Sequence, residues 1–278
     1  MSNNNEEIKN TFEEKLRTFA ESLNSYVSTP DGQWTIKGFI DTYQKIYTIS
    51  SDTKLVSKVL EIHLFPRILQ FADENGYRLI PAQEQNYYPD ISFVSLDETH
   101  KFAVDIKTTY RDPKYQKFCN GFTLGSHGEY FVNRNSSKNI QYPYNDYSGH
   151  YCLGIIYSRA VASSVDVTRT HNVEDLDSIH SSIQDFLFFV AEKWKIASDT
   201  PGSGNTANIG SIKKISDILS SNGMFSRLGE TWFDDYWINY KKITKSDGSG
   251  KITNLKDFVE YKGGDINLIV PKPRRSNK

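Results

Sequence analysis

The residues best suited to chemistry in this chain are two aspartates and a lysine in neighbouring segments that alternate like strands. Residues 90–96 and 101–107 both alternate between apolar and polar types, and a short turn separates them, which is typical of a β-hairpin. A register symmetric about this turn pairs Asp90 with Asp105, and cross-strand partners lie about 5 Å apart on one face. Lys107 follows Asp105 by two positions, so it lies on the same face.

Two adjacent carboxylates repel each other unless a cation lies between them, and oxygen ligands of this kind suit Mg²⁺. Such an ion activates water and stabilises charge developing at phosphorus, and a nearby lysine orients the water and offsets the same charge. A surface ion pair of Asp105 with Lys107, with Asp90 capping its strand, is the competing interpretation. The apolar neighbours of Asp105 favour the metal site, because charges in a central strand are costly unless they are paired or bind a metal.

A second segment that could contact a ligand is the glycine-rich stretch 201–211. It formally fits a dinucleotide fingerprint, but it follows a helix-like segment where that motif requires a strand, so this class is disfavoured. A flexible surface turn and a loop that reads DNA bases both remain open. Glycines let a backbone approach base edges closely, and asparagine can bond adenine N6 and N7. The sequence has no zinc-like His or Cys spacing and no Gly-x-Ser-x-Gly elbow for a covalent nucleophile.

Two amphipathic helices are predicted before these segments. Residues 8–27 carry apolar side chains at spacings of three and four, and a second helix begins at Ser51 or Asp52 and ends at Asn75-Gly76. Glu61 lies within the second helix, where by itself it is interpreted as a surface glutamate.

The remaining elements follow from apolar runs and turn formers. Residues 77–110 and 153–157 are strand-like, residues 111–149 are expected to be irregular, and helices are predicted at 183–196 and around 232–240. The chain has no internal repeat and no low-complexity linker, so one compact unit is favoured.

Composition excludes several classes of protein. No apolar stretch approaches the roughly 20 residues of a membrane span, and the N-terminus lacks a secretory signal pattern. Two cysteines cannot form a disulfide framework and suggest a reducing compartment, so a cytoplasmic protein is expected. The formal charge of −1 argues mildly against a nucleic-acid binder. Residues 241–278 nevertheless hold ten Lys or Arg and four Asp or Glu. Such a basic tail can contact DNA phosphates, but a solvated, mobile end is the favoured interpretation.

Six segments together resemble the EcoRV family of type II restriction endonucleases, within the PD-(D/E)xK nuclease superfamily. The similarity extends from about residue 45 to about residue 240, and the segments occur in the same order at nearly constant spacing. The segments are 51–54, 85–90, 103–110, 122–125, 138–140 and 202–212.

The resemblance implies an α/β fold with a mixed β-sheet core flanked by helices, assembled as a U-shaped homodimer. Residues 1–278 would form one endonuclease domain, with an N-terminal helical extension 1–30 and a basic C-terminal tail 241–278. It also implies Mg²⁺-dependent hydrolysis of double-stranded DNA at a palindrome, with GATATC cut at its centre to blunt ends that carry 5′-phosphate and 3′-hydroxyl groups. A companion DNA methyltransferase is expected in the host.

Residue roles are carried over by position. Asp90, Asp105 and Glu61 would hold the metal, which overturns the surface interpretation of Glu61, and Lys107 would act on the transition state. The major-groove loop, with Asn205 on adenine and Thr206 beside it, would comprise Gly202, Ser203, Gly204, Asn205, Thr206, Ala207 and Asn208.

Four other positions are assigned to DNA, and two positions depart from the family. Gln85 and Asn86 would belong to a minor-groove loop, and Thr109 and Lys138 would lie near the phosphates. Ala207 stands where the family has a hydroxyl residue, and Glu84 replaces an amide, which bears on affinity more than on reaction class. A DNA repair or junction nuclease with the same core, and a DNA-binding module without catalysis, remain alternatives.

Overall fold

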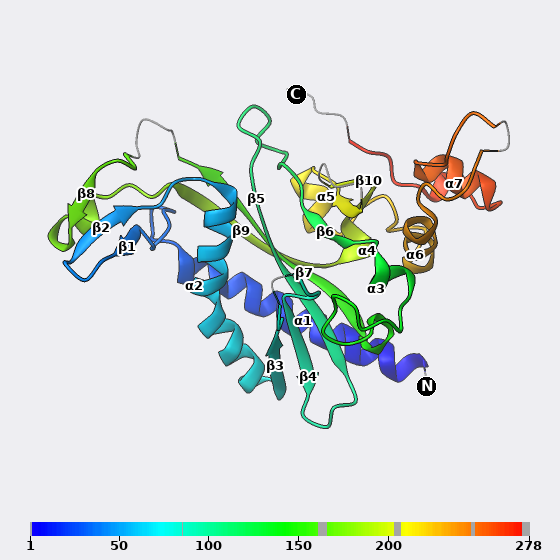
Figure 1. The fold of residues 1–278 in the computed structure, drawn as a ribbon, viewed down its shortest axis with the longest axis horizontal. Coiled ribbons are helices and arrows are strands. Elements are labelled where there is room, and N and C mark those ends of the chain that lie inside the picture. The colour runs from blue at the N-terminus through cyan, green and yellow to red at the C-terminus, as the bar shows by residue number, and fades with distance from the viewer. Residues whose placement is uncertain (1, 85, 161–165, 203–206, 246–247, 274–278) are drawn as a thin grey trace.

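The computed structural model describes residues 2–84, 86–160, 166–202, 207–245 and 248–273 (Figure 1). Its centre is a five-stranded sheet in the order β3-β4-β5-β7-β9, in which β5 and β7 run parallel and the other neighbours antiparallel. The strands are β3 (Tyr77–Pro81), β4 (Ile91–Ser95), β5 (Lys101–Tyr110), β7 (Gly149–Arg159) and β9 (Ile183–Glu192). The sheet is therefore mixed, as predicted.

Two long helices, α1 (Ser2–Val27) and α2 (Thr53–Glu74), cover one face of this sheet. The Asp52 side chain accepts hydrogen bonds from the backbone N–H groups of Lys54 and Leu55, which fixes the first turn of α2. Gly76, with a φ of 74°, follows the C-cap and lets the chain leave the helix. Both helices and both predicted ends of α2 are confirmed.

Side chains alternate between two hydrophobic cores, one on each face of the sheet. Phe102, Val104 and Ile106 of β5 pack with α1 and α2. The intervening face carries Ala103, which packs with Cys152 and with residues of α6 (Glu230–Asn239) and α7 (Leu255–Tyr261). Helices therefore flank the sheet on both faces, and Asp105 and Lys107 share the second face with Ala103.

The predicted helix at 183–196 is wrong. Residues 183–192 form β9, which pairs with β7 so that Ala191 lies opposite Cys152, and only one turn of helix, α4 (Lys193–Ile196), follows. A short apolar run lacks the periodicity that distinguishes a buried strand from a buried helix. Here the aromatic and β-branched residues of 183–192 form a strand that hydrogen-bonds to β7, which is itself buried.

Two small sheets extend from the central one. The first combines β1 (Gly38–Ile40), β2 (Lys45–Thr48) and β8 (Thr170–Asn172), and forms the arm at the left of Figure 1. The second, in the order β10-β11-β6, combines β10 (Ala197–Pro201), β11 (Asn208–Ser211) and β6 (Thr123–Ser126). The short helices are α3 (Glu129–Val132), α5 (Ile215–Leu219) and the 3₁₀ turns Tyr144–Asp146, Val173–Ser178 and Ile266–Leu268.

Both ends of the described chain join the cores. In α1, Phe12 and Leu16 are buried against the sheet. The solvated end expected for 241–278 is wrong as far as Val270, because Leu255 and Phe258 of α7 are fully buried and Val270 is nearly so. Apolar residues at helical spacing in 255–259 outweigh the basic surroundings. Among the described residues, no helix combines the length and apolarity that crossing a bilayer requires.

Candidate active site

The hairpin register places the two aspartates side by side. Strands β4 and β5 pair Ile91 with Val104 and Ser92 with Ala103, which is the predicted symmetric register without a bulge. Asp90 lies one residue before β4, and its backbone N–H donates to Asp105 Oδ1 at 3.1 Å. The two carboxylates therefore meet at the open end of the hairpin.

Lys107 bridges the two carboxylates. Its Nζ lies 3.2 Å from Asp90 Oδ2 and 3.3 Å from Asp105 Oδ2. The backbone N–H of Ile106 donates to Asp90 Oδ2 at 2.8 Å and fixes that carboxylate further. The acid–lysine cluster, defined as Asp90, Asp105 and Lys107, is thus assembled as the sequence predicted.

Burial and charge act differently on the two acids. Burial tends to raise the pKa of Asp105, but the ammonium groups of Lys107 and Lys193 outweigh it and hold that pKa below its usual range. Burial raises the pKa of Asp90, Lys107 opposes this, and the charges of Asp105 and Glu61 reinforce it. Burial would lower the pKa of Lys107, but the two aspartates raise it instead. The lysines therefore outweigh the burial of Asp105 but not that of Asp90.

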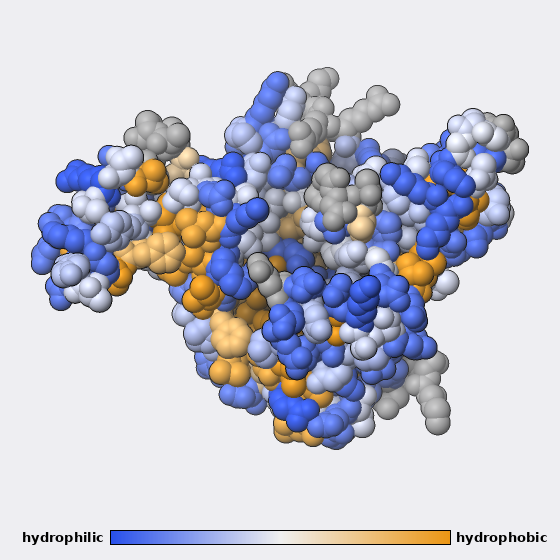
Figure 2. Space-filling model, in the orientation of Figure 1, coloured by the Kyte–Doolittle hydropathy of each residue, from blue (hydrophilic) through white to orange (hydrophobic). Residues whose placement is uncertain are grey.

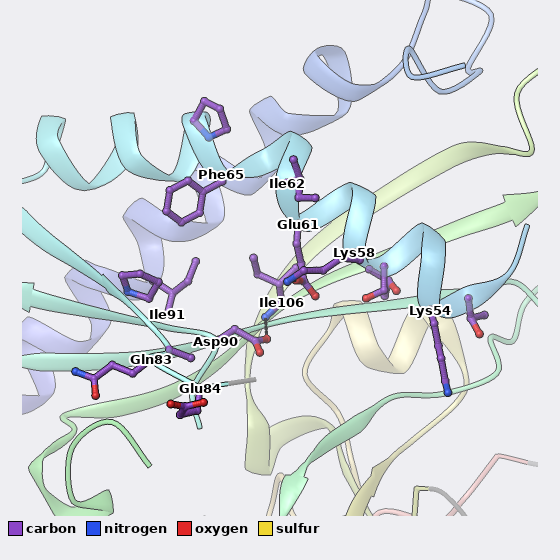
Figure 3. A pocket seen from close by; sticks show the side chains of 16 residues that line it. Lys54, Lys58, Glu61, Ile62, Phe65, Gln83, Glu84, Asp90, Ile91 and Ile106 are labelled. Carbon is purple, nitrogen blue, oxygen red and sulfur yellow. Dashed lines mark hydrogen bonds and ion pairs between the residues drawn. The ribbon is translucent and has the colours of Figure 1, made fainter. Parts of the chain in front are cut away.

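Asp90 is the member of the cluster that lines a cleft of about 1180 Å³ between α2 and the β3–β4 connection (Figure 3). The Asp90 side chain is 37% exposed toward this cleft, whereas that of Asp105 is 3% exposed. Glu61 and Lys58 project from α2 into the same cleft, and Lys58 Nζ lies 2.7 Å from Glu61 Oε2. Across the described residues, no three His, Cys, Asp or Glu side chains are close enough to hold one ion. Glu61 therefore lines the same cleft as Asp90 but is not close enough to complete a three-acid ion site with Asp90 and Asp105.

Lys193 is a member of the site that sequence reasoning missed. Its Nζ lies 2.9 Å from Asp105 Oδ2 and 3.6 Å from the centre of the Tyr88 ring, and its side chain is 5% exposed. Burial lowers the pKa of Lys193, and Asp105 opposes this. The pairing of β9 could have revealed Lys193. Cys152 of β7 lies between Asp105 on one side and Ala191 of β9 on the other. Lys193 follows Ala191 by two residues, so its side chain returns to the face of the sheet that carries Asp105.

Comparisons with known proteins agree with this geometry. A family model described as restriction endonuclease EcoRV matches residues 30–263. The type II restriction enzyme EcoRV of Escherichia coli is 35% identical over 235 residues, which cover 83% of this chain and 93% of that relative. The chain belongs to the EcoRV restriction endonuclease family. It is therefore a DNA-hydrolysing endonuclease, and the predicted enzyme class is confirmed.

The EcoRV-family match includes every residue of the acid–lysine cluster, together with Glu61 and Lys193. It also includes the β10–β11 hairpin, whose base is tightly closed. Gly202 N–H donates to Asn208 O at 3.0 Å, and a Cβ at Gly202 would lie 3.1 Å from Ile209 O. The predicted base-reading residues Ser203, Gly204, Asn205 and Thr206 lie outside the described residues.

Other positions with a predicted DNA role in the EcoRV family are scattered around the site. Asn86 is exposed beside Glu84, which lines the cleft, and Gln85 lies outside the described residues. Thr109 is buried on the β5 face that carries Lys107, and Lys138 is exposed in the irregular segment after α3. The backbone oxygen of Ala207 accepts a hydrogen bond from His127 N–H at 2.8 Å.

Proposed function

We propose that this enzyme is a Mg²⁺-dependent type II endonuclease that hydrolyses double-stranded DNA at GATATC. It cuts at the centre of the site and leaves blunt ends with 5′-phosphate and 3′-hydroxyl groups. The observation that carries the chemical part is the meeting of Asp90, Asp105 and Lys107 at the end of a hairpin, beside a cleft that Asp90 lines. The sequence specificity draws on the resemblance of segment 202–212 to the family loop.

The residues present fit a magnesium ion. Asp90 and Asp105 offer hard oxygen donors at a cleft, and Asp90 is the acid that the lysines compensate incompletely. Asp90 and Asp105 would hold the ion, and Glu61 would approach from α2. When bound there, Mg²⁺ would supply Lewis-acid stabilisation of charge at phosphorus and a more acidic water.

Lys107 would stabilise charge on the reacting phosphate. Its ammonium lies between the two carboxylates, and its side chain is 24% exposed, so it can turn toward a phosphate that approaches Asp90. An ammonium held ready in a partly dry site stabilises developing negative charge more strongly than water does. The raised pKa of Lys107 means that it carries this charge at neutral pH.

The β10–β11 hairpin would read the sequence. Asn205 would contact adenine in the major groove with Thr206 beside it, and Gly202 would allow the close approach of the loop. Replacement of Asn205 by Ala is expected to reduce discrimination at adenine by about 10- to 100-fold, since one bidentate contact is removed. Cleavage rates on GATATC and on duplexes with one substituted base pair measure this. An unchanged ratio contradicts the assignment.

Further DNA contacts belong to the same proposal. Gln85 and Asn86 would approach the minor groove beside the cleft, and Thr109 and Lys138 would lie near the phosphates. The central TA step would bend on binding, because pyrimidine–purine steps deform at low energetic cost. Bending would bring the scissile phosphate to the two carboxylates.

A U-shaped homodimer would match the two-fold symmetry of the palindrome. The arm of β1, β2 and β8 supports a self-association surface, because large apolar side chains are exposed on it (Figure 2). Tyr43 is 83% exposed and Ile40 is 61% exposed there. Patches of this kind often mark protein interfaces. Sedimentation velocity over a range of protein concentrations tests for the dimer.

The cellular setting follows from the activity. An enzyme that cuts GATATC would damage unmodified host DNA, so a companion methyltransferase and a cytoplasmic location complete the proposal.

The decisive experiment is a digest of two plasmids that differ by a single GATATC site, with Mg²⁺ and with EDTA. One blunt cut that requires both the site and Mg²⁺ is the expected result. Cutting at other sequences would contradict the proposed specificity and favour a repair or junction nuclease. No cutting under any condition would contradict the proposed catalysis and favour a DNA-binding module.

A further inference from the structure

Lys193 adds to the acid–lysine cluster a second cation, which the proposed mechanism does not use. Lys107 and Lys193 both contact Asp105 Oδ2, at 3.3 Å and 2.9 Å. The two ammonium groups come from different elements, Lys107 from β5 and Lys193 from the first residue of α4. Since both are held by the same oxygen, their surroundings determine which of them can leave it.

Lys193 sits in a pocket that fits its ammonium. The Tyr88 ring lies 3.6 Å from Nζ on one side. On another side is Gly125, where an added Cβ would come within 3.2 Å of Lys193 Nζ and 3.3 Å of the Tyr130 hydroxyl. The Lys193 side chain is 5% exposed, so it has no free volume into which to turn.

Lys107 has the opposite surroundings. Its side chain is 24% exposed, and it also contacts Asp90, which opens into the cleft. An ion bound between the aspartates would compete with the lysines for their oxygens, because like charges repel at such distances. Only Lys107 can move away from Asp105 without entering a filled space.

We propose that Lys193 is a positioning residue that anchors the Asp105 carboxylate, so that Lys107 is released toward the DNA phosphate when the metal binds. This inference rests on the proposed function, because it takes Asp105 as a metal ligand and Lys107 as the group that reaches the phosphate. Lys193 itself touches neither substrate nor the reacting atoms.

The substitution Lys193→Met keeps the length and apolar stem of the side chain and removes its charge. Lys107 then becomes the remaining ammonium on Asp105, so single-turnover cleavage at saturating Mg²⁺ is expected to fall by about 100-fold. Removal of a positive charge beside the ion site is expected to tighten Ca²⁺ binding by roughly tenfold. These changes run in opposite directions, whereas a loosened fold would weaken both binding and cleavage.

Two further variants separate charge from packing. Lys193→Arg keeps a cation, so its Ca²⁺ affinity is expected to stay within about threefold of the wild type, with part of the cleavage rate restored. Lys195→Met is the matched control, because Lys195 lies two residues further along the same turn and contacts Glu192, not Asp105. It is expected to change neither Ca²⁺ binding nor cleavage.

Ca²⁺ binding is measured by calorimetry on the full-length enzyme, cleavage by rapid quench on a GATATC duplex, and folding by thermal melting. If Lys193→Met cleaves at the wild-type rate, or loses Ca²⁺ affinity and rate together, the inference is overturned. Asp105→Asn tests the proposed function separately. If the wild type binds Ca²⁺ and Asp105→Asn binds it equally well, the metal site itself is wrong, whatever Lys193 does.

Discussion

Two clusters of buried charge begin at consecutive residues and lie on opposite faces of the central sheet. Lys193 joins the acid–lysine cluster on the face of Ala191. Glu192 points the other way and contacts Lys9 of α1, as well as Lys195 at 2.5 Å. We call this second group the helix-side cluster, since it connects α1 to the end of β9 and to Glu230 of α6 through Lys9.

Both clusters combine acids with lysines. In each, one acid has a lowered pKa (Glu192 or Asp105) and another has a raised pKa (Glu230 or Asp90). Burial would raise the pKa of Glu192, but Lys9 and Lys195 outweigh it and lower that pKa. In the acid–lysine cluster, burial and the neighbouring carboxylates raise the pKa of Asp90 despite Lys107. Buried charge alone therefore does not identify a site in this protein. What distinguishes the site is that two carboxylates and a lysine meet at the end of one hairpin, where Asp90 lines the cleft beside α2.

The largest expected effect concerns the acid shared by both lysines of the site. Asp105→Asn retains an oxygen for Lys107 and Lys193 but removes the charge that a metal needs. Cleavage is expected to fall by at least about 1000-fold, since several kcal/mol of metal-assisted stabilisation are removed. DNA binding without metal is expected to remain, and rapid-quench cleavage together with fluorescence anisotropy measures both.

An Asp105→Asn enzyme that cuts at more than a tenth of the wild-type rate would contradict the role of Asp105 as a metal ligand. The matched control is Asp217→Asn, which removes an aspartate that pairs with Lys214 at the start of α5, outside both clusters. Its cleavage rate is expected to equal that of the wild type.

The helix-side cluster is expected to act on stability alone. Glu192→Gln leaves Lys9 and Lys195 without their shared carboxylate, and breaking a buried pair costs about 3 kcal/mol in the free energy of unfolding. Urea unfolding measures the loss, and the cleavage rate of the folded enzyme is expected to change less than threefold. Lys256→Gln, in an exposed pair with Glu260, serves as the stability control. A large loss of cleavage in folded Glu192→Gln would remove the distinction between the clusters.

Some residues of the site could be placed from the sequence, and others could not. The register of β4 and β5 followed from alternation on both sides of a short turn, so Asp90, Asp105 and Lys107 could be brought together by counting. Glu61 could not be placed by periodicity, because its role depends on how α2 lies across the sheet. Only the family resemblance suggested it, and the structure places it in the cleft, paired with Lys58.

The sequence did not predict the role of Lys193, because residues 183–196 were predicted to form a helix. Residues 183–192 form the edge strand β9, most of whose side chains are buried. Nothing in a short apolar run reveals its partner, since β7 precedes it by more than twenty residues. Once the strand is known, the alternation of its side chains puts Glu192 and Lys193 on opposite faces. Local sequence patterns therefore predict which side chains of one hairpin lie together. Residues such as Lys193, which come from a distant strand, can be placed only when the strand pairing is known.

The smallest expected effect separates the clusters by their pH dependence without metal. The pKa of Asp90 is raised in the folded enzyme. Between the usual aspartate pKa and that raised value, the native state therefore binds a proton that the unfolded chain has already released. The free energy of unfolding therefore falls as the pH rises from about 4 through that raised pKa. Asp90→Asn cannot ionise, so in EDTA at pH 7 its melting temperature is expected to exceed that of the wild type by about 1–2 °C.

The pH dependence of stability that Glu192 contributes has the opposite sign. Its pKa is lowered in the folded enzyme, so its contribution to stability is present above the usual glutamate pKa and is lost as the pH falls through the lowered value. The gain of Asp90→Asn should accordingly vanish near pH 4, and the loss in Glu192→Gln should shrink there. Melting curves from pH 4 to pH 7 measure both differences. If Asp90→Asn melts below the wild type at pH 7, Lys107 compensates the Asp90 carboxylate as fully as Lys9 and Lys195 compensate Glu192, and the raised pKa of Asp90 is contradicted.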